Sequence, residues 1–357
     1  MKLYNCNVCG QLTYFENVSC VRCGAKLGFR PDQLALEAIE ANDDGTWHAV
    51  GDATARYRLC ANYTGLGVCN WLVASEEDNA FCVACRLNRT IPDLSVAGHL
   101  ALWHKLEIEK RRLVYSLLRL GLPLVPRDRD ASGLAFDFLA DTEPRFSERG
   151  RVITGHAQGL ITLNVAEADP VVRERMRAQM AEPYRTMLGH FRHESGHYYW
   201  ERMIAGQPWL EPFRAIFGDE TRDYTQALDR HYEQGPPADW PEHYVSAYAS
   251  SHPWEDWAET WAHYLHILDT SETAQQFGLE VRPRAGDDET LTASHDIDPY
   301  RYDAVESLIG RWLPLTYALN SLNRSMGHEH LYPFVLSPAV IDKLAFVHRV
   351  VRNPSGA

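Results

Sequence analysis

All eight cysteines of this 357-residue chain lie in its first 85 residues. Clustered, paired thiols in a chain without a secretory signal are typical of metal ligands, because disulfides do not persist in a reducing compartment. The first four follow the spacing C-x2-C-x10-C-x2-C, and they are Cys6, Cys9, Cys20 and Cys23. Two tight turns with this spacing can each offer two thiolates to one tetrahedral Zn²⁺, so these residues predict a zinc ribbon.

The other four cysteines are spaced less regularly. They form a C-x8-C pair and a C-x2-C pair, and they are Cys60, Cys69, Cys82 and Cys85. We expect a second four-cysteine zinc site, because the C-x2-C pair is a regular zinc knuckle. Two alternatives stay open at this point: an exchange of pairs between the two sites, or ordinary buried cysteines.

The charge of the chain argues against nucleic-acid binding. Its formal net charge is −13, and residues 1–90 hold 8 Lys and Arg against 10 Asp and Glu. Each zinc ion held by four thiolates adds about −2 more. The cysteine-rich region is therefore expected to repel phosphate and to have a structural or protein-docking role.

No apolar run in the sequence is long enough to predict a membrane span. The first residues lack the apolar core of a signal peptide, so we expect a cytoplasmic protein with no membrane partner.

The distribution of turn residues and apolar periodicity predicts two domains. Residues 1–90 form the zinc-ribbon module, and residues 91–357 form a mostly helical domain with a small sheet. The expected fold class is therefore α+β. The main helices of the second domain are predicted near residues 100–117, 183–204, 254–268, 299–323 and 338–351.

Strands are predicted by short runs with β-branched or alternating residues. In the second domain they lie at 134–139 and in a hairpin formed by 151–155 and 160–165. In the first domain they lie at 46–50 and 55–59. Between the cysteine pairs, the spacing of apolar residues over 34–41 favours a short helix.

The sequence His193-Glu194-Ser195-Gly196-His197 is an H-E-x-x-H motif. On a helix, residues i and i+4 share a face, so both imidazoles can reach one Zn²⁺. Glu194 falls beside them, where it can take a proton from the attacking water. The alternative is a pair of structural histidines on an ordinary helix, but the flanking segment has clear helical spacing.

A catalytic zinc needs a third protein ligand. The segment Trp254–His263 has helical periodicity and places Glu255 and Glu259 one turn apart on one face. We predict Glu255 as the ligand and Glu259 as the residue that orients a ligand histidine, with the reverse assignment as the alternative.

A hydroxyl or imidazole donor is also expected to stabilise the oxyanion of the tetrahedral intermediate. Tyr248, seven residues before Glu255, is one candidate, and the others are Tyr244, Tyr198, Tyr199 and His263.

These motifs together resemble the bacterial zinc-binding metallopeptidases that begin with a zinc ribbon. The resemblance extends over nearly the whole chain. It rests on Cys6–Cys23, the Cys82–Cys85 knuckle, the segments 159–169, HESGHYYW at 193–200 and EDWAETWAHYLH at 255–266. The H-E-x-G-H segment at 193–197 and the later E-x-x-A-E segment at 255–259 also resemble gluzincins of the lethal-factor type. That resemblance implies zinc binding by Glu255 and oxyanion stabilisation by Tyr248, although Pro253, just before Trp254 and Glu255, departs from the pattern.

The strand before the H-E-x-x-H helix is a candidate substrate site. In zinc proteases of this class an edge strand pairs with the backbone of an extended substrate. We therefore predict substrate contacts by Leu160, Ile161, Thr162 and Leu163. The alternative is an ordinary core strand.

The sequence thus predicts a zinc-dependent peptidase acting on a protein or peptide substrate, with one catalytic and two structural Zn²⁺ ions. The zinc ribbon is expected to hold or recruit that substrate. Two alternatives remain: a zinc-ribbon docking protein with a catalytically silent peptidase fold, and an autoinhibited peptidase.

Overall fold

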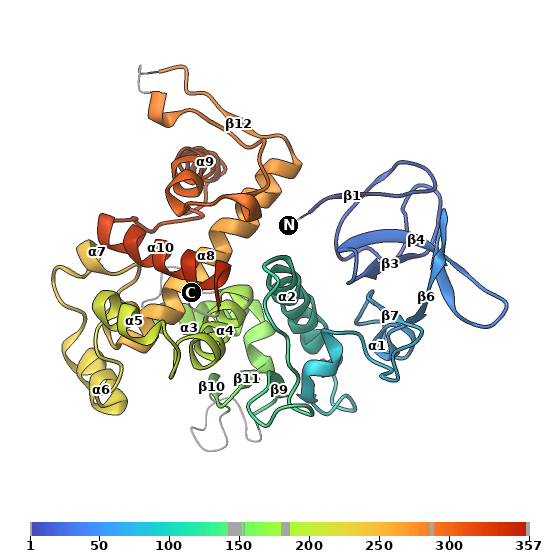
Figure 1. The fold of residues 1–357 in the computed structure, drawn as a ribbon, viewed down its shortest axis with the longest axis horizontal. Helices are drawn as coiled ribbons and strands as arrows, with labels where there is room; N and C mark the ends of the chain where they lie inside the picture. The colour runs from blue at the N-terminus through green and yellow to red at the C-terminus, as the bar shows by residue number, and fades with distance from the viewer. Residues whose placement is uncertain (1, 142–151, 153, 180–185, 286–288, 355–357) are drawn as a thin grey trace. The chain divides into compact units, whose positions relative to one another are not determined.

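The computed structural model describes residues 2–141, 152, 154–179, 186–285 and 289–354 (Figure 1). The chain divides into two compact units, Met1–Arg173 and Glu174–Ala357. The first unit holds the cysteine-rich module, one long helix and a second small sheet. The second unit is almost entirely helical. This mixture of separate sheets and helices confirms the α+β class.

The cysteine-rich module is built from two antiparallel sheets. A short hairpin of β1 (Tyr4–Asn5) and β2 (Leu12–Thr13) carries the first cysteine pair. A five-stranded sheet follows in the order β3-β4-β5-β6-β7. Its strands are β3 (Leu27–Arg30), β4 (Ala35–Ala41), β5 (Trp47–Ala49), β6 (Asp52–Leu59) and β7 (Leu72–Ala74).

The predicted helix over residues 34–41 is wrong, because this segment is strand β4. Leu36 and Ala38 are buried while Glu37 between them is not, which is the period of two expected for a half-buried strand. The helical spacing in the sequence arose from alanines, which fit either periodicity. The strands predicted at 46–50 and 55–59 are confirmed as β5 and β6.

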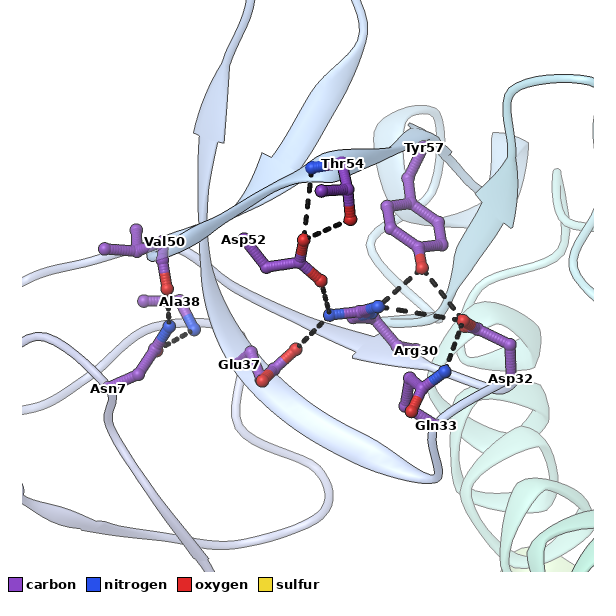
Figure 2. A network of polar contacts seen from close by, with 10 residues as sticks. All are labelled: Asn7, Arg30, Asp32, Gln33, Glu37, Ala38, Val50, Asp52, Thr54 and Tyr57. Carbon is purple, nitrogen blue, oxygen red and sulfur yellow. Dashed lines mark hydrogen bonds and ion pairs between the residues drawn. The ribbon is translucent and has the colours of Figure 1, made fainter.

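A buried arginine organises one face of this sheet (Figure 2). Arg30 is only 6% exposed, and it donates to Glu37 over 2.9 Å and to Asp52 over 3.2 Å. Its Nε donates to the hydroxyl of Tyr57 over 2.9 Å, and that hydroxyl donates to Asp32 over 2.9 Å. Since an unpaired buried charge is costly, these partners make the burial of the guanidinium tolerable and tie β3, β4 and β6 together.

The first unit also contains the short helix α1 (Ala61–Thr64), helix α2 (His99–Arg119) and a four-stranded sheet in the order β10-β11-β9-β8. The strands are β8 (Asn88–Thr90), β9 (Ala135–Leu139), β10 (Gly155–Ala157) and β11 (Leu160–Asn164). The predicted second strand of the hairpin, 160–165, is present as β11, but its partner β10 begins only at Gly155, the last residue of the predicted first strand, and residues 151 and 153 of that prediction lie outside the described residues. The turn residues Gln158 and Gly159 both have positive φ, as a two-residue type I′ turn requires.

The second unit is arranged around a pair of helices, α4 (Met187–Met203) and α8 (Pro253–Gln276), which pack along each other. Helices α5 (Leu210–Phe217) and α10 (Pro338–Arg352) also pack on α8. The other helices are α6 (Tyr224–Gln234), α7 (Trp240–His243), α9 (Val305–Ser325) and α3 (Pro170–Gln179), which contains the residues at which the chain divides into its two units. The second unit also holds a hairpin of β12 (Glu280–Val281) and β13 (Ala293–Ser294). In the part of the chain that the structure describes, no helix is long and apolar enough to cross a membrane.

Candidate metal centre

Helix α4 presents the two histidines of the H-E-x-x-H motif on one face. The helix begins after Thr186, whose hydroxyl accepts from the N–H of Gly189 over 2.9 Å and caps the first turn. His193 and His197 are one turn apart, and their Nε2 atoms lie 3.2 Å from each other. Two imidazole nitrogens at this separation can face one metal ion.

Helix α8 supplies a carboxylate to the same point. Pro253 is the first helical residue and His252 caps the helix, so the proline starts the helix rather than disturbing it. Glu255 follows in the first turn and is 1% exposed. Its Oε2 lies 3.0 Å from Nε2 of His193, and its Oε1 lies 3.5 Å from Nε2 of His197.

The donor set fits a zinc ion. One ligand atom from each of His193, His197 and Glu255 lies within 4.8 Å of the others. Two nitrogens and one oxygen from two rigid helices make a three-ligand set of the type that catalytic zinc sites use. Burial is the largest influence on Glu255 and raises its pKa, but the neighbouring imidazoles outweigh it and hold the pKa well below its usual range. An ionised buried carboxylate is what a cation requires here.

Glu259 contacts the other side of His193. Its Oε1 lies 2.7 Å from Nδ1 of that imidazole, and its Oε2 accepts from the hydroxyl of Ser246 over 2.7 Å. Burial raises the pKa of Glu259, but the hydrogen bond to His193 and the charge of that imidazole lower the pKa to about 2. A carboxylate in this place fixes the ring so that Nε2 points toward Glu255.

Ser195 and Gly196, two of the three residues between the motif's histidines, pack against α8. A Cβ atom on Gly196 would lie 3.0 Å from the Cα of Ala258 and 3.1 Å from Trp261. The indole of Trp257 donates to the carbonyl of Gly196 over 2.8 Å, and the indole of Trp261 donates to the hydroxyl of Ser195 over 3.1 Å. The two helices therefore meet closely at the level of the metal ligands.

The predicted base and oxyanion donor are placed in the same unit. Glu194 is 9% exposed on α4, directly after His193. Tyr248 begins the short turn η3 (Tyr248–Ser250), and its ring centroid lies 6.0 Å from that of His193. Burial, with the charge of Glu255, raises the pKa of Tyr248 well above its usual value, so the hydroxyl keeps its proton and can donate.

The other candidate donors are engaged elsewhere. Tyr198 and Tyr199 are fully buried, and Tyr199 stacks on Trp261 in the helix interface. The ring of Tyr244 faces Nζ of Lys343 at 4.2 Å. Nδ1 of His263 lies 2.7 Å from the hydroxyl of Tyr332, and burial lowers its pKa to about 4. These contacts favour Tyr248 among the five.

Sequence reasoning missed Tyr224, which lies at the start of α6. Its hydroxyl donates to Oε1 of Glu255 over 2.6 Å. Burial and the charge of Glu255 raise its pKa, so it too remains a donor. The only signal in the sequence is Asp223 before it, whose side chain caps α6 by accepting from the N–H of Gln226 over 2.9 Å. A helix cap gives no hint of a contact 31 residues further along the chain.

The cysteines form two groups in the first unit, as their spacing suggested. One group is Cys6, Cys9, Cys20 and Cys23, and the other is Cys60, Cys69, Cys82 and Cys85. Within each group the sulfurs lie within 4.8 Å of one another, and the geometry shows no exchange of pairs. Gly10 and Gly24 follow the two pairs of the first group with φ of +72° and +75°, and each donates back to the carbonyl of Cys6 or Cys20. Both sets fit tetrahedral zinc.

Two asparagines next to ligand cysteines connect these groups to the rest of the module. Asn7 accepts from the N–H of Ala38 over 2.7 Å and donates to the carbonyl of Val50 over 2.6 Å (Figure 2). Asn70, which follows Cys69, donates to the carbonyls of Phe15 and Asn17 over 2.7 and 3.2 Å. The second metal group is thereby bonded to the loop that precedes Cys20 of the first.

The predicted edge strand is wrong. Strand β11 lies between β9 and β10, and Leu160, Ile161 and Thr162 are paired on both sides. Leu163 pairs with Phe138 of β9, and Ile161 and Leu163 are buried. Backbone N–H and C=O groups that already pair within a sheet cannot pair with a substrate strand. The alternative interpretation, an ordinary core strand, therefore holds for residues 160–162. The strand belongs to the first unit, whereas the histidines lie in the second.

A zinc-ribbon domain profile matches residues 3–96, and the profile of a family described as "Putative zinc-binding metallo-peptidase" matches residues 99–350. The chain belongs to this metallopeptidase family. The match includes both α4 and α8, the helices that carry the histidines and Glu255.

The similarity to known relatives extends over nearly the whole chain. Uncharacterized proteins of Mycobacterium bovis and of two strains of Mycobacterium tuberculosis are 46% identical to it over 354 residues. The alignments cover 98% of this chain and 95% of each relative. No solved structure matches the chain.

Proposed function

We propose that this metallopeptidase-family protein hydrolyses peptide bonds of a protein or peptide substrate, with zinc held by His193, His197 and Glu255. The observation that carries the proposal is the convergence of these three ligands from two packed helices, with Glu194 beside them and Glu259 behind His193. A structural zinc site is normally closed by four protein ligands, whereas three protein ligands leave a position for a reactant.

Zinc supplies a Lewis acid that polarises a carbonyl and makes water acidic. In the proposed reaction, Glu194 takes the proton of the attacking water and later passes it to the leaving amine. Its position directly after a ligand histidine, on a helix fixed by the Gly196 contact, holds the carboxylate at a constant place relative to the metal. Tyr248 donates its hydroxyl hydrogen to the oxyanion that forms on the substrate carbonyl.

The two cysteine groups take structural zinc in this proposal. Each has four thiolates and so leaves no position for a reactant. Thiols arranged in metal sets rather than disulfides require a reducing compartment, which supports a cytoplasmic location. The ribbon is suited to docking a protein substrate, because its valines Val8 and Val21, inside the two C-x2-C turns, are 51% and 83% exposed.

The test compares cleavage of an unfolded protein by the zinc-loaded wild type and by Glu194→Gln. The substitution keeps the size of the side chain and removes the base, so hydrolysis should fall to background while the zinc content and the melting temperature are retained. Glu211→Gln, which changes an exposed carboxylate, should cleave like the wild type.

Equal cleavage by the wild type and Glu194→Gln would contradict the proposed role of Glu194. No cleavage by the wild type, even in a broad set of unfolded proteins and peptides, would favour a docking protein with a silent peptidase fold. Cleavage only after a partner is added would favour autoinhibition.

A further inference from the structure

One oxygen of Glu255 already has a partner outside the metal ligands. The hydroxyl of Tyr224 lies 2.6 Å from Oε1, which is also 3.5 Å from Nε2 of His197, while Oε2 lies closer to the histidines, at 3.0 Å from Nε2 of His193. Glu255 is 1% exposed, whereas Tyr224 is 37% exposed at the start of α6. Both oxygens of the carboxylate therefore face the ligand histidines, and Oε1 alone is also held by a partly exposed tyrosine.

Tyr224 is fixed by the same helix turn that carries Glu255. Nε2 of His252, the cap of α8, donates to the carbonyl of Arg222 over 3.1 Å, and its Nδ1 accepts from the N–H of Trp254 over 3.1 Å. The ring of Tyr224 meets His252 edge-on at 5.2 Å and Trp254 at 6.0 Å. The backbone before Tyr224 and its ring are thus both anchored to the start of α8.

A carboxylate can bind a metal through one oxygen or through both, and a free side chain can rotate between these arrangements. A hydrogen bond to one oxygen removes part of that freedom and reduces the electron density which that oxygen can offer. In metal sites, partners of this kind orient the ligand and are worth about 10–100-fold in affinity or activity.

We propose that Tyr224 is a positioning residue, whose hydroxyl holds Oε1 of Glu255 so that the carboxylate binds zinc mainly through Oε2. The inference rests on the proposed function in taking His193, His197 and Glu255 as the zinc ligands. It adds a contribution from α6, a helix outside the two that carry those ligands. It parallels the contact of Glu259 with His193, so a side chain outside the ligand set holds each of these two ligands.

The experiment measures metal affinity of the full chain, apart from any cleavage. Zinc released to a competing chelator before thiol-reactive agents are added reports the histidine site, and zinc released afterwards reports the cysteine groups. Tyr224→Phe should weaken zinc at the histidine site by about 10-fold or more and leave the cysteine-bound zinc unchanged. With Co²⁺ at the histidine site, its visible spectrum should change, because the coordination of Glu255 changes. Tyr317→Phe, which alters a tyrosine 54% exposed on α9, is the matched control and should behave as the wild type.

A second comparison separates positioning from a merely structural role. In a Glu255→Ala background the hydroxyl has no carboxylate to hold, so adding Tyr224→Phe should cost no further affinity. An equal loss in both backgrounds, or a Tyr224→Phe variant with the affinity and Co²⁺ spectrum of the wild type, would overturn the proposal. Because these are binding measurements, a wild type that binds zinc here but cleaves nothing would refute the proposed function and leave this test valid.

Discussion

Nδ1 of His193 lies 2.7 Å from Oε1 of Glu259, while Nε2 of the same ring lies 3.0 Å from Glu255. A carboxylate can only accept, so Nδ1 carries the hydrogen and Nε2 has its lone pair free for a metal. The two glutamates of α8 are one turn apart, and the imidazole lies between them. This geometry assigns them different parts in the proposed site.

The first prediction distinguishes these two glutamates. Glu259→Ala should weaken zinc at the histidine site by about 10–100-fold, because the ligand histidine loses its orienting partner. Glu255→Ala should weaken it further, because a ligand itself is lost. Chelator competition on both variants checks the order, with the exposed Glu329→Ala as the control. An emptied site in Glu259→Ala and a filled site in Glu255→Ala would reverse the assignment.

The second prediction concerns the oxyanion. Tyr248→Phe removes one hydroxyl, and if that hydroxyl donates in the transition state, kcat should fall by roughly 10²–10³ with KM little changed. Tyr244→Phe should change kcat by no more than a few-fold, because the ring of Tyr244 is engaged with Lys343. Steady-state kinetics on a cleaved peptide decides between them. A Tyr248→Phe enzyme with the kcat of the wild type would exclude Tyr248 as the donor.

The third prediction is a pH dependence of stability from a buried ion pair in the second unit. Nζ of Lys343 lies 2.6 Å from Oδ2 of Asp256, and both side chains are buried. Burial raises the pKa of Asp256 from 3.8 to about 7, although Lys343 opposes the shift. A carboxyl with a raised pKa stabilises the fold when protonated, so its contribution is present below the unfolded value and is lost as the pH rises through about 7.

Lys343→Met removes the cation and should raise that pKa further. The variant should lose about 3–5 kcal/mol when the carboxyl is ionised. The gap between its melting temperature and that of the wild type should therefore widen between about pH 6 and about pH 9. When Lys343→Met is added to an Asp256→Asn background, the difference in melting temperature between these two variants should not depend on pH. A gap of constant size in Lys343→Met would show that Asp256 does not titrate in this range.

The fourth prediction concerns the two cysteine groups. The pure protein should contain about three zinc ions per chain, one for each ligand set of the described residues. Asn70→Ala removes the bonds to Phe15 and Asn17 that connect the groups, so zinc should leave both groups faster on treatment with a chelator. Asn42→Ala, which affects only a turn bond to Thr46, is the control. Faster release from the second group alone would show that the groups are independent.

Most of the metal centre could be predicted from the helical spacing of its residues. His193 and His197, and likewise Glu255 and Glu259, are four residues apart, and on a helix this spacing fixes a shared face. The cysteine groups were equally readable, because turns with C-x2-C spacing depend on local geometry alone. Both kinds of pattern are short-range, and the structure places these residues together in the expected sets.

What could not be predicted depends on contacts distant in the sequence. Tyr224 reaches Glu255 across the break between α6 and α8, and no local pattern specifies that distance. The position of β11 within its sheet depends on pairing with β9, which precedes it by more than 20 residues. The prediction for residues 34–41 failed for a different reason, because a mixture of alanine, leucine, isoleucine and glutamate fits a strand or a helix until its partner strands are known.

The missing side chain of Gly196 determines how close the two ligand-bearing helices can come. A methyl group there would press on the Cα of Ala258 and on Trp261, and backbone cannot move aside as a flexible side chain can. Replacement by alanine should therefore spread α4 from α8 and stretch the distances from both imidazoles to Glu255. In this protein the motif is thus better written H-E-x-G-H, and the number of chains that match it by chance is correspondingly smaller. A pattern search that also requires a tryptophan-rich helix with two glutamates one turn apart would retrieve chains able to build this helix contact, rather than chains that share only a pentapeptide.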